Sequence, residues 1–154
     1  MSRTAAASMR ILGPSHIELM RQMLAVFGEA FEEQETYGKA PPSDAYLEQL
    51  LGSELFIAVA ALKGDAVVGG LAAYVLQKFE QERSEIYVYD LAVALPHRRE
   101  GTATALIQEL KAIAVARGAH VIFIQADRGD EPAIQLYTKL GRREDVLHFD
   151  IECD

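Results

Sequence analysis

The chain is poor in cysteine and in long apolar runs, and each shortage excludes a class of protein. Its one cysteine, Cys153, excludes an internal disulfide and a metal site built from several cysteines, and we expect no metal cofactor. No apolar run approaches the roughly 20 residues that cross a bilayer. The first ten residues also lack the apolar core of a signal peptide, so we expect a cytoplasmic protein.

Basic residues are outnumbered, at 15 Lys and Arg against 23 Asp and Glu, which gives a formal net charge of −8. A surplus of this sign argues against nucleic acid and anionic membranes as partners, and it leaves small cationic ligands open. Half of the residues are hydrophobic, which is enough to build a packed core. Because there is no repeat, linker or low-complexity tract, residues 1–154 are expected to form one domain.

Hydrophobic periodicity predicts an alternation of strands and helices. Apolar residues three and four positions apart, from Ile17 to Phe31, indicate an amphipathic helix, and "KGD" at 63–65 indicates a hairpin turn. Ser43 or Asp44 can cap a second helix. In chain order we expect a strand at 9–12, helices at 17–31 and 44–51, strands at 55–62, 66–76 and 84–93, a helix at 102–117, a strand at 120–126, a helix at 131–140 and a last strand at 144–152. This order predicts an α/β (α+β) fold with one mixed sheet.

The stretch "HRREGTATAL" at 97–106 gathers basic residues in an acidic chain. A strand, a tight turn and a helix start form the geometry that binds phosphates, because the first N–H groups of a helix lack intrahelical partners. Gly101 tolerates unusual dihedral angles, and Arg98 and Arg99 can bind phosphate oxygens. The alternative is a solvated basic turn. The chain contains neither GxxxxGK[ST] nor GxGxxG after its first strand, which excludes a P-loop and a Rossmann fingerprint.

Three motifs in order resemble the GCN5-related N-acetyltransferases: "DLAV" at 90–93, "RREGTA" at 98–103 and "AIQLYTKLG" at 133–141. The resemblance implies a mixed sheet with two splayed strands, flanked by about four helices, and acetyl coenzyme A as the acetyl donor. Asp130 and Arg142 depart from it, since an asparagine and an aromatic residue are usual there. The residues implied at the cofactor are Leu91, Ala92, Val93, Arg98, Arg99, Glu100, Gly101, Thr102, Ala103 and Thr104.

Acetyl transfer needs a base for the amine, a donor that polarises the thioester carbonyl, and an acid for the leaving thiolate. Tyr137, at the family's tyrosine position, is the candidate acid, since a phenol with a pKa of about 10 is protonated at neutral pH. The alternative for Tyr137 is a core tyrosine. Asp90 is the candidate base or amine anchor, and the alternative is a carboxylate that caps a turn or pairs with an arginine. Glu85 is the second candidate base, and a backbone N–H near Leu91 can polarise the carbonyl.

Acidic residues occur in several clusters along the chain. If the clusters rim one cleft, they attract a small polycation, but each cluster by itself can also be a solvated charged surface. Tyr87 and Tyr89 share one strand face by alternation and can line the acceptor site. The predicted acceptor-binding residues are Glu33, Tyr89, Asp90, Asp127, Asp130, Glu131 and Asp150.

A longer set of matches is similar to the small, type I aminoglycoside 3-N-acetyltransferases. It includes "FGEAF" at 27–31, "KFEQ" at 78–81 and "VLHFDI" at 146–151, outside the cofactor region. The resemblance implies acetylation of the 3-amino group of 2-deoxystreptamine in gentamicin-like antibiotics, and hence antibiotic resistance. Edge strands and an apolar last strand allow a homodimer, which is frequent in that family. Two alternatives stay open: an acetyltransferase for polyamines or other small cations, and a non-catalytic module that binds acetyl coenzyme A.

Overall fold

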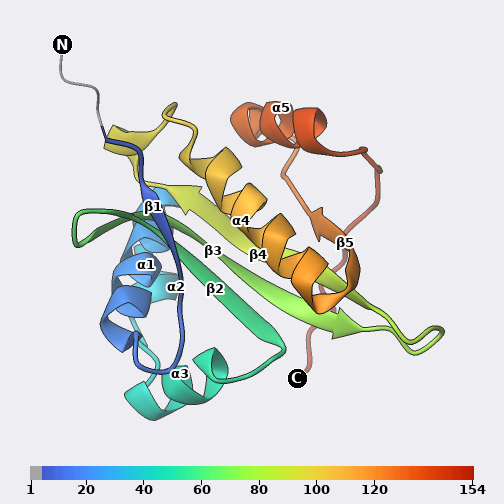
Figure 1. Cartoon of the computed structure of the whole chain (residues 1–154), viewed down its shortest axis with the longest axis horizontal. Helices are drawn as coiled ribbons and strands as arrows, with labels where there is room; N and C mark the ends of the chain where they lie inside the picture. The colour runs from blue at the N-terminus through green and yellow to red at the C-terminus, as the bar shows by residue number, and fades with distance from the viewer. Residues whose placement is uncertain (1–4) are drawn as a thin grey trace.

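The computed structural model describes residues 5–154, and a five-stranded sheet with helices on both faces makes up most of it (Figure 1). The first four residues, part of the stretch inspected for a signal peptide, lie outside the described residues. The strands are β1 (Ser8–Ile11), β2 (Phe56–Lys63), β3 (Ala66–Gln77), β4 (Ser84–Val93) and β5 (Ala119–Ile124). The helices are α1 (Ile17–Ala30), α2 (Gln34–Gly38), α3 (Asp44–Leu51), α4 (Thr102–Arg117) and α5 (Glu131–Leu140), and a 3-10 turn, η1 (Leu95–His97), precedes α4.

The strands follow one another across the sheet in chain order. Neighbouring strands are antiparallel except β4 and β5, which are parallel because α4 crosses between them. Each face of the sheet covers its own core. Phe27 and Leu47 belong to the core on the α1 and α3 side, and Leu71 and Leu106 belong to the core under α4. The mixed sheet confirms the predicted fold class.

Local signals in the sequence account for several element boundaries. Gly64, with a φ of +60°, lies in the turn between β2 and β3, as predicted for a hairpin. Ser43 rather than Asp44 caps α3, because its Oγ accepts a hydrogen bond from the Tyr46 N–H at 3.1 Å. Gly118, with a φ of +74°, ends α4 in the left-handed region.

Helix α1 packs closely on β3, and this contact determines where the acidic end of α1 lies. A Cβ atom on Gly70 would overlap the side chain of Met23, so the approach requires glycine. Met23 is fully buried at this contact. Because α1 also contacts β4, the α1 end and the segment that follows it lie beside that strand.

One predicted element is wrong. Residues 144–152 form no strand, since the segment after α5 has no backbone partner within residues 5–154. Its alternating apolar side chains are largely exposed, at 77% for Leu147, 77% for Phe149 and 87% for Ile151. A strand needs a neighbour for its N–H and C=O groups, and alternation of apolar residues does not supply one. The short α2 was not predicted, because five residues are too few for a helical period.

Candidate active site

A bulge in β4 places two consecutive residues, Tyr89 and Asp90, on the same face of the sheet. Val88 and Asp90 pair with adjacent residues of β3, so Tyr89 is the extra residue. Val88 packs in the core under α4, whereas Ala92 packs in the core on the α1 side. In a regular strand Asp90 would share the face of Val88. The bulge turns Asp90 toward α1 and α2 instead.

Asp90 is half-buried and bonded to a tyrosine that sequence reasoning missed. The Tyr37 hydroxyl donates to Asp90 Oδ2 at 2.8 Å. Burial raises the pKa of Asp90, the Tyr37 hydrogen bond lowers it and the negative charge of Glu33 raises it, so that the pKa lies above its ordinary value. No arginine of residues 5–154 pairs with Asp90, so the alternative of an Arg–Asp pair does not apply. A carboxylate with a raised pKa is suited to accept a proton from an amine.

Aromatic rings from four strands form a row across the sheet. Tyr89 contacts Tyr74 and Tyr87 edge-on, with ring centroids 5.9 and 5.8 Å apart. The row continues from Tyr74 to Phe56 at 5.3 Å, and from Tyr87 to Phe123 at 4.8 Å. The predicted shared face of Tyr87 and Tyr89 is therefore confirmed. Tyr89 is 62% exposed, so part of its ring is accessible to a ligand beside Asp90.

Strands β4 and β5 separate about halfway along β4, as predicted. Their pairing ends where Val88 lies opposite Ile124, which is the last residue of β5. Strand β4 continues to Val93 and keeps its antiparallel partner β3 on its other side. The second half of β4 therefore has one free edge, facing the gap between the strands.

Alternation along β4 identifies the backbone groups at this free edge. The Ala94 N–H donates to a carbonyl of β3, so the backbone groups of Ala92 also face β3. Those of Leu91 and Val93 face the gap. The Val93 carbonyl accepts a hydrogen bond from Arg98 Nε at 3.0 Å, which holds the following turn against the strand. The Leu91 N–H thus points into the gap, as its predicted role requires.

The basic turn after β4 contains two residues in the left-handed region, Arg99 with a φ of +63° and Gly101 with a φ of +82°. The left-handed φ of Gly101 favours glycine, because other residues rarely adopt it. A Cβ on Gly101 would meet no atom within 4 Å, so the space beside it is open. Gly101 precedes α4, whose first N–H groups have no side-chain cap. An open, uncapped helix start beside arginines can bind an anion.

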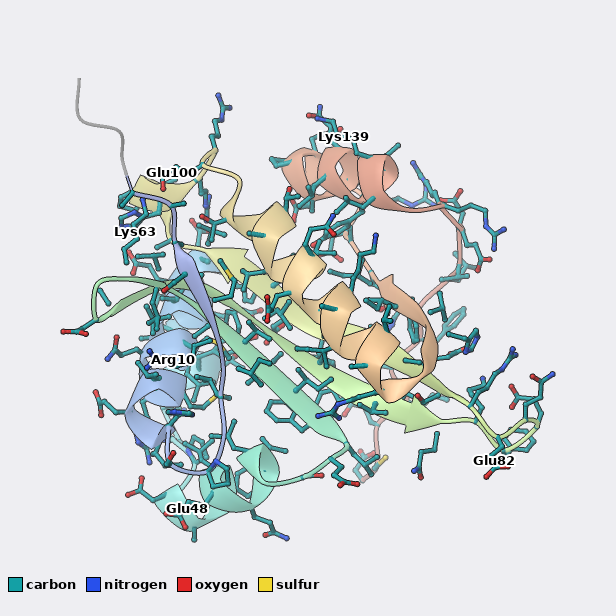
Figure 2. The ribbon with its side chains drawn as sticks, viewed as in Figure 1. Arg10, Glu48, Lys63, Glu82, Glu100 and Lys139 are labelled. Carbon is teal, nitrogen blue, oxygen red and sulfur yellow. The ribbon has the colours of Figure 1, made fainter. Side chains whose placement is uncertain are left out.

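Glu100 lies within the same turn, where its carboxylate would repel a phosphate. Lys63, at the end of β2, forms an ion pair with Glu100, and Figure 2 shows the two labelled side chains at the same corner of the molecule. This lysine lies 37 positions away in the sequence and was not predicted. Thr102 is buried, whereas Ala103 and Thr104 are partly exposed in the first turn of α4. Because Lys63 offsets the charge of Glu100, the positive charges of Arg98 and Arg99 dominate the turn.

Tyr137 lies on α5, a helix that buries none of its residues fully, so Tyr137 is not an ordinary core tyrosine. Burial of its ring, and then the negative charge of Asp130, raise the pKa of Tyr137 to about 12. Asp130 caps α5 by accepting a hydrogen bond from the Ala133 N–H at 3.3 Å, as predicted. The Tyr137 hydroxyl has no hydrogen-bond partner among residues 5–154. A protonated phenol of this kind can donate to a ligand.

The second candidate base lies far from the first. Glu85 and Asp90 are five positions apart on one strand, which corresponds to roughly 16 Å. Glu85 Oε1 instead lies 3.8 Å from Lys78 Nζ and 3.5 Å from His120 Nε2. The Lys78 ammonium and the His120 ring occupy the Glu85 carboxylate, whereas the Asp90 carboxylate faces the aromatic row. The geometry therefore favours Asp90.

The predicted acidic residues lie in different places. Glu33 lies near enough to Asp90 for its negative charge to raise the pKa of that carboxyl group. Asp150 lies on the exposed C-terminal segment, where its Oδ1 is 2.9 Å from His148 Nε2. The three acidic residues near the start of α5 are Asp127, Asp130 and Glu131. The structure thus joins Glu33 to the Asp90 site and Asp130 to the Tyr137 site.

Two hollows lie next to α1. The larger, of about 530 Å³, lies between α1 and α2 and includes Tyr37 and Gly28 in its lining. The smaller, of about 270 Å³, lies between the end of α1 and the basic turn, where Glu29 and Glu32 line it together with Arg98. The smaller hollow therefore joins the acidic α1 end to the turn that can bind an anion.

Within residues 5–154, no group of three or more His, Cys, Asp or Glu side chains is arranged to hold a metal ion. No helix in the described part of the chain is both long and apolar enough to span a membrane. Cys153 is a free, exposed thiol near the end of the C-terminal segment.

The fold, the free edge of β4 and the basic turn define the class of protein. Residues 20–141 match the model of the acetyltransferase (GNAT) family, and the chain belongs to this family. The predicted superfamily is therefore confirmed, together with its fold.

Individual proteins of known name within and around this family are similar to the chain. The chain is 58% identical to an aminoglycoside acetyltransferase from an uncultured soil metagenomic sample, with a TM-score of 0.96 over 97% of this chain and 100% of that one. It is 27% identical to a second aminoglycoside acetyltransferase from an uncultured soil metagenomic sample, solved in complex with sisomicin, with a TM-score of 0.89 over 96% and 97% of the two chains. It is also 29% identical to an N-alpha-acetyltransferase of Sulfurisphaera tokodaii over 110 residues, which cover 64% of this chain and 63% of that protein.

Proposed function

We propose that this chain transfers an acetyl group from acetyl coenzyme A to the 3-amino group of 2-deoxystreptamine in gentamicin-type aminoglycosides. The observation that carries the proposal is the β4 bulge, which turns Asp90 toward Glu33 and the aromatic row. A half-buried carboxylate next to a second acidic group attracts a polycation. We further propose that the reaction takes place in the cytoplasm, within one domain, and confers resistance to the antibiotic.

The basic turn suits the acetyl donor, which would supply an activated thioester. Arg98 and Arg99 would bind the diphosphate together with the first N–H groups of α4, at Thr102, Ala103 and Thr104. Lys63 would offset the charge of Glu100 beside it. The free edge of β4 would bind the amide groups of the donor's arm through Leu91 and Val93.

The transfer would proceed by direct attack in a ternary complex. Asp90 takes the proton of the acceptor ammonium, and the neutral amine then attacks the thioester carbon. The Leu91 N–H stabilises the oxyanion as the C–N bond forms. The C–S bond breaks, and Tyr137 donates its hydroxyl proton to the departing thiolate. The nitrogen loses its second proton to solvent as the amide forms, Tyr137 is reprotonated from solvent, and Asp90 releases the first proton to solvent, so that the net products are the amide, the free thiol and one proton.

The aminoglycoside acceptor has specific support. Two relatives carry that activity in their names, one of them bound to sisomicin, and 58% identity over 97% of this chain favours a shared substrate class. Exposed Tyr89 offers a ring surface to a polyammonium sugar, which can bind through cation–π contacts. The 3-amino position rests on the sequence resemblance to the type I enzymes.

The test is release of free thiol from acetyl coenzyme A with a panel of acceptors. Purified protein is assayed with gentamicin, sisomicin, spermidine and an N-terminal peptide, and NMR then locates the new amide. We expect turnover with the two antibiotics and a 3-N-acetyl product. A preference for spermidine would favour the polyamine alternative, and a preference for the peptide would favour N-terminal acetylation. Binding of acetyl coenzyme A without turnover of any acceptor would favour a non-catalytic module.

We also propose a homodimer. The C-terminal segment exposes Leu147, Phe149 and Ile151 in strand-like alternation, and β5 has one unpaired edge. Exposed apolar surface of this kind is typical of an interface. Sedimentation of the wild type should give twice the 17.0 kDa chain mass, and Phe149→Asp should lower it. A wild type that sediments at 17.0 kDa at micromolar concentration would contradict the dimer.

A further inference from the structure

Tyr37 belongs to α2, but its side chain is fixed by α1 and by β4. Its ring lies 6.2 Å from that of Phe27 and 6.0 Å from that of Phe31, both on or next to α1. A Cβ on Gly28 would come within 3.1 Å of Tyr37 Cβ, so the glycine leaves room for the tyrosine. The hydroxyl then reaches Asp90, 53 positions further along the chain. Two aromatic contacts and a hydrogen bond are more than the packing of a short surface helix requires.

The hydrogen bond to Asp90 divides the two carboxylate oxygens. The Tyr37 hydroxyl donates to Oδ2 at 2.8 Å and remains protonated, because burial and the neighbouring carboxylate raise the pKa of Tyr37. Oδ1 accepts no hydrogen bond from residues 5–154. A carboxylate held by one oxygen has a fixed rotation, and its other oxygen can accept the proton of a ligand.

We propose that Tyr37 is a positioning residue, which orients Asp90 so that its free oxygen meets the acceptor ammonium. This inference rests on the proposed function, because it assigns the free oxygen to the acceptor amine. Tyr37 does not itself need to touch the substrate. Its role is exerted through Asp90.

The charges around Asp90 give this role a pH signature. Glu33 faces it from the segment before α2, and the phenols of Tyr74 and Tyr87 face it from the sheet. Burial raises the pKa of both phenols, so they are neutral in the working range and Glu33 is the charged neighbour, which disfavours ionisation of Asp90. The hydrogen bond from Tyr37 opposes Glu33 and the effect of burial. Its loss should raise the pKa of Asp90 further.

The experiment compares Tyr37→Phe with Tyr46→Phe. The control tyrosine is 61% exposed on α3, and its hydroxyl forms no hydrogen bond with residues 5–154. For Tyr37→Phe we expect kcat/KM for sisomicin to fall on the order of tenfold or more. The acidic limb of the kcat/KM profile should move to higher pH, and the KM for acetyl coenzyme A should not change. Tyr46→Phe should leave all three quantities as in the wild type.

A double-mutant cycle guards against a general loss of structure. In the Asp90→Asn background, Tyr37→Phe should cause little further loss of kcat/KM, because Tyr37 acts through Asp90. If the losses of kcat/KM from the two substitutions multiply in the double variant, the inference is overturned. It is also overturned if the wild type is active and the acidic limb of its kcat/KM profile lies at the same pH in Tyr37→Phe. A wild type that acetylates no aminoglycoside would instead overturn the proposed function, and the acceptor role of Tyr37 with it.

Discussion

The middle of the sheet and the C-terminal region are packed very differently. Seven consecutive residues of β2 are buried, whereas neither β5 nor α5 has a fully buried residue. Figure 1 shows α4 lying across the sheet, while α5 lies apart from the sheet. Asp90 lies in the packed region and Tyr137 in the open one. The two halves of the proposed chemistry therefore come from regions of different packing.

This difference in packing indicates which residues should affect stability and which should affect function. Burial of apolar surface stabilises the packed region, at about 25 cal/mol per Å². The open region exposes apolar surface and backbone groups, which a ligand arm or a second chain can bind. Substitutions in the open region should change turnover or association, and substitutions in the packed region should change the free energy of unfolding.

The largest effect is expected for Tyr137→Phe in the open region. Loss of the proton donor should lower kcat by about 10²- to 10⁴-fold, whereas the Tm should stay within about 1 °C because the ring is kept. With a pKa of about 12, Tyr137 stays protonated in the wild type and should give no descending limb in the kcat profile below about pH 10. The exposed neighbour substitution Gln135→Ala serves as the control. An equal kcat for Tyr137→Phe and the control would remove Tyr137 from the mechanism.

The packed region is where the sequence was most informative. Strand β4 was predicted at its observed bounds, 84–93, because the segment is rich in tyrosine and β-branched residues. The predicted strand at 144–152 failed although its apolar residues alternate. Alternation does not report the presence of a partner strand, and none lies beside this segment within residues 5–154.

The next effect contrasts Leu71→Ala with Phe149→Ala. Leu71 is fully buried, so its truncation should lower the free energy of unfolding by about 2–5 kcal/mol at any protein concentration. Phe149 is 77% exposed in the single chain, so its truncation should matter through association. We expect the Tm of Phe149→Ala to fall below the wild type only where the wild type is dimeric. Thermal melts over a hundredfold range of concentration measure both. A concentration-independent loss for Phe149→Ala of the size seen for Leu71→Ala would break the comparison.

Arg98→Ala tests the junction between the regions, with a smaller expected effect. Removal of a charge-assisted bond to phosphate should raise the KM for acetyl coenzyme A about 10- to 100-fold and change the KM for antibiotic little. Arg143→Ala is the matched control, since that arginine pairs with Asp145 on the exposed C-terminal segment. Equal increases in both KM values would argue against the phosphate assignment, because they would indicate a general distortion of the turn that Arg98 holds to Val93.

The residues that sequence reasoning missed share one property. Tyr37 meets Asp90 across 53 positions, and Lys63 meets Glu100 across 37. Neither belongs to a local motif, and each is defined by a tertiary contact. The motif residues at the basic turn could be predicted because their chemistry is local, since it depends on a turn and a helix start. The acceptor side depends on the bulge at Tyr89, and no periodic pattern announces an extra residue in a strand.

The smallest expected effect is a gain in thermal stability, and it concerns Asp90, the charged residue within the packed region. Asp90 has a pKa raised mainly by burial, so the folded chain binds its proton more tightly than the unfolded chain. The stability that this contributes is fully present below the ordinary pKa of an aspartate and is lost as the pH rises through the raised value. At pH 7.5 the wild type therefore bears the ionised carboxylate at a loss of stability, which Asp90→Asn removes while an amide oxygen still accepts the Tyr37 hydrogen bond. We expect the Tm of Asp90→Asn to exceed that of the wild type by up to about 2 °C at pH 7.5, with a smaller difference at pH 5, and kcat/KM for acetyl transfer to fall to a low but measurable value. A variant that is less stable than the wild type at both pH values would mean that Asp90 serves packing, and the functional reading of the bulge would lose its physical basis.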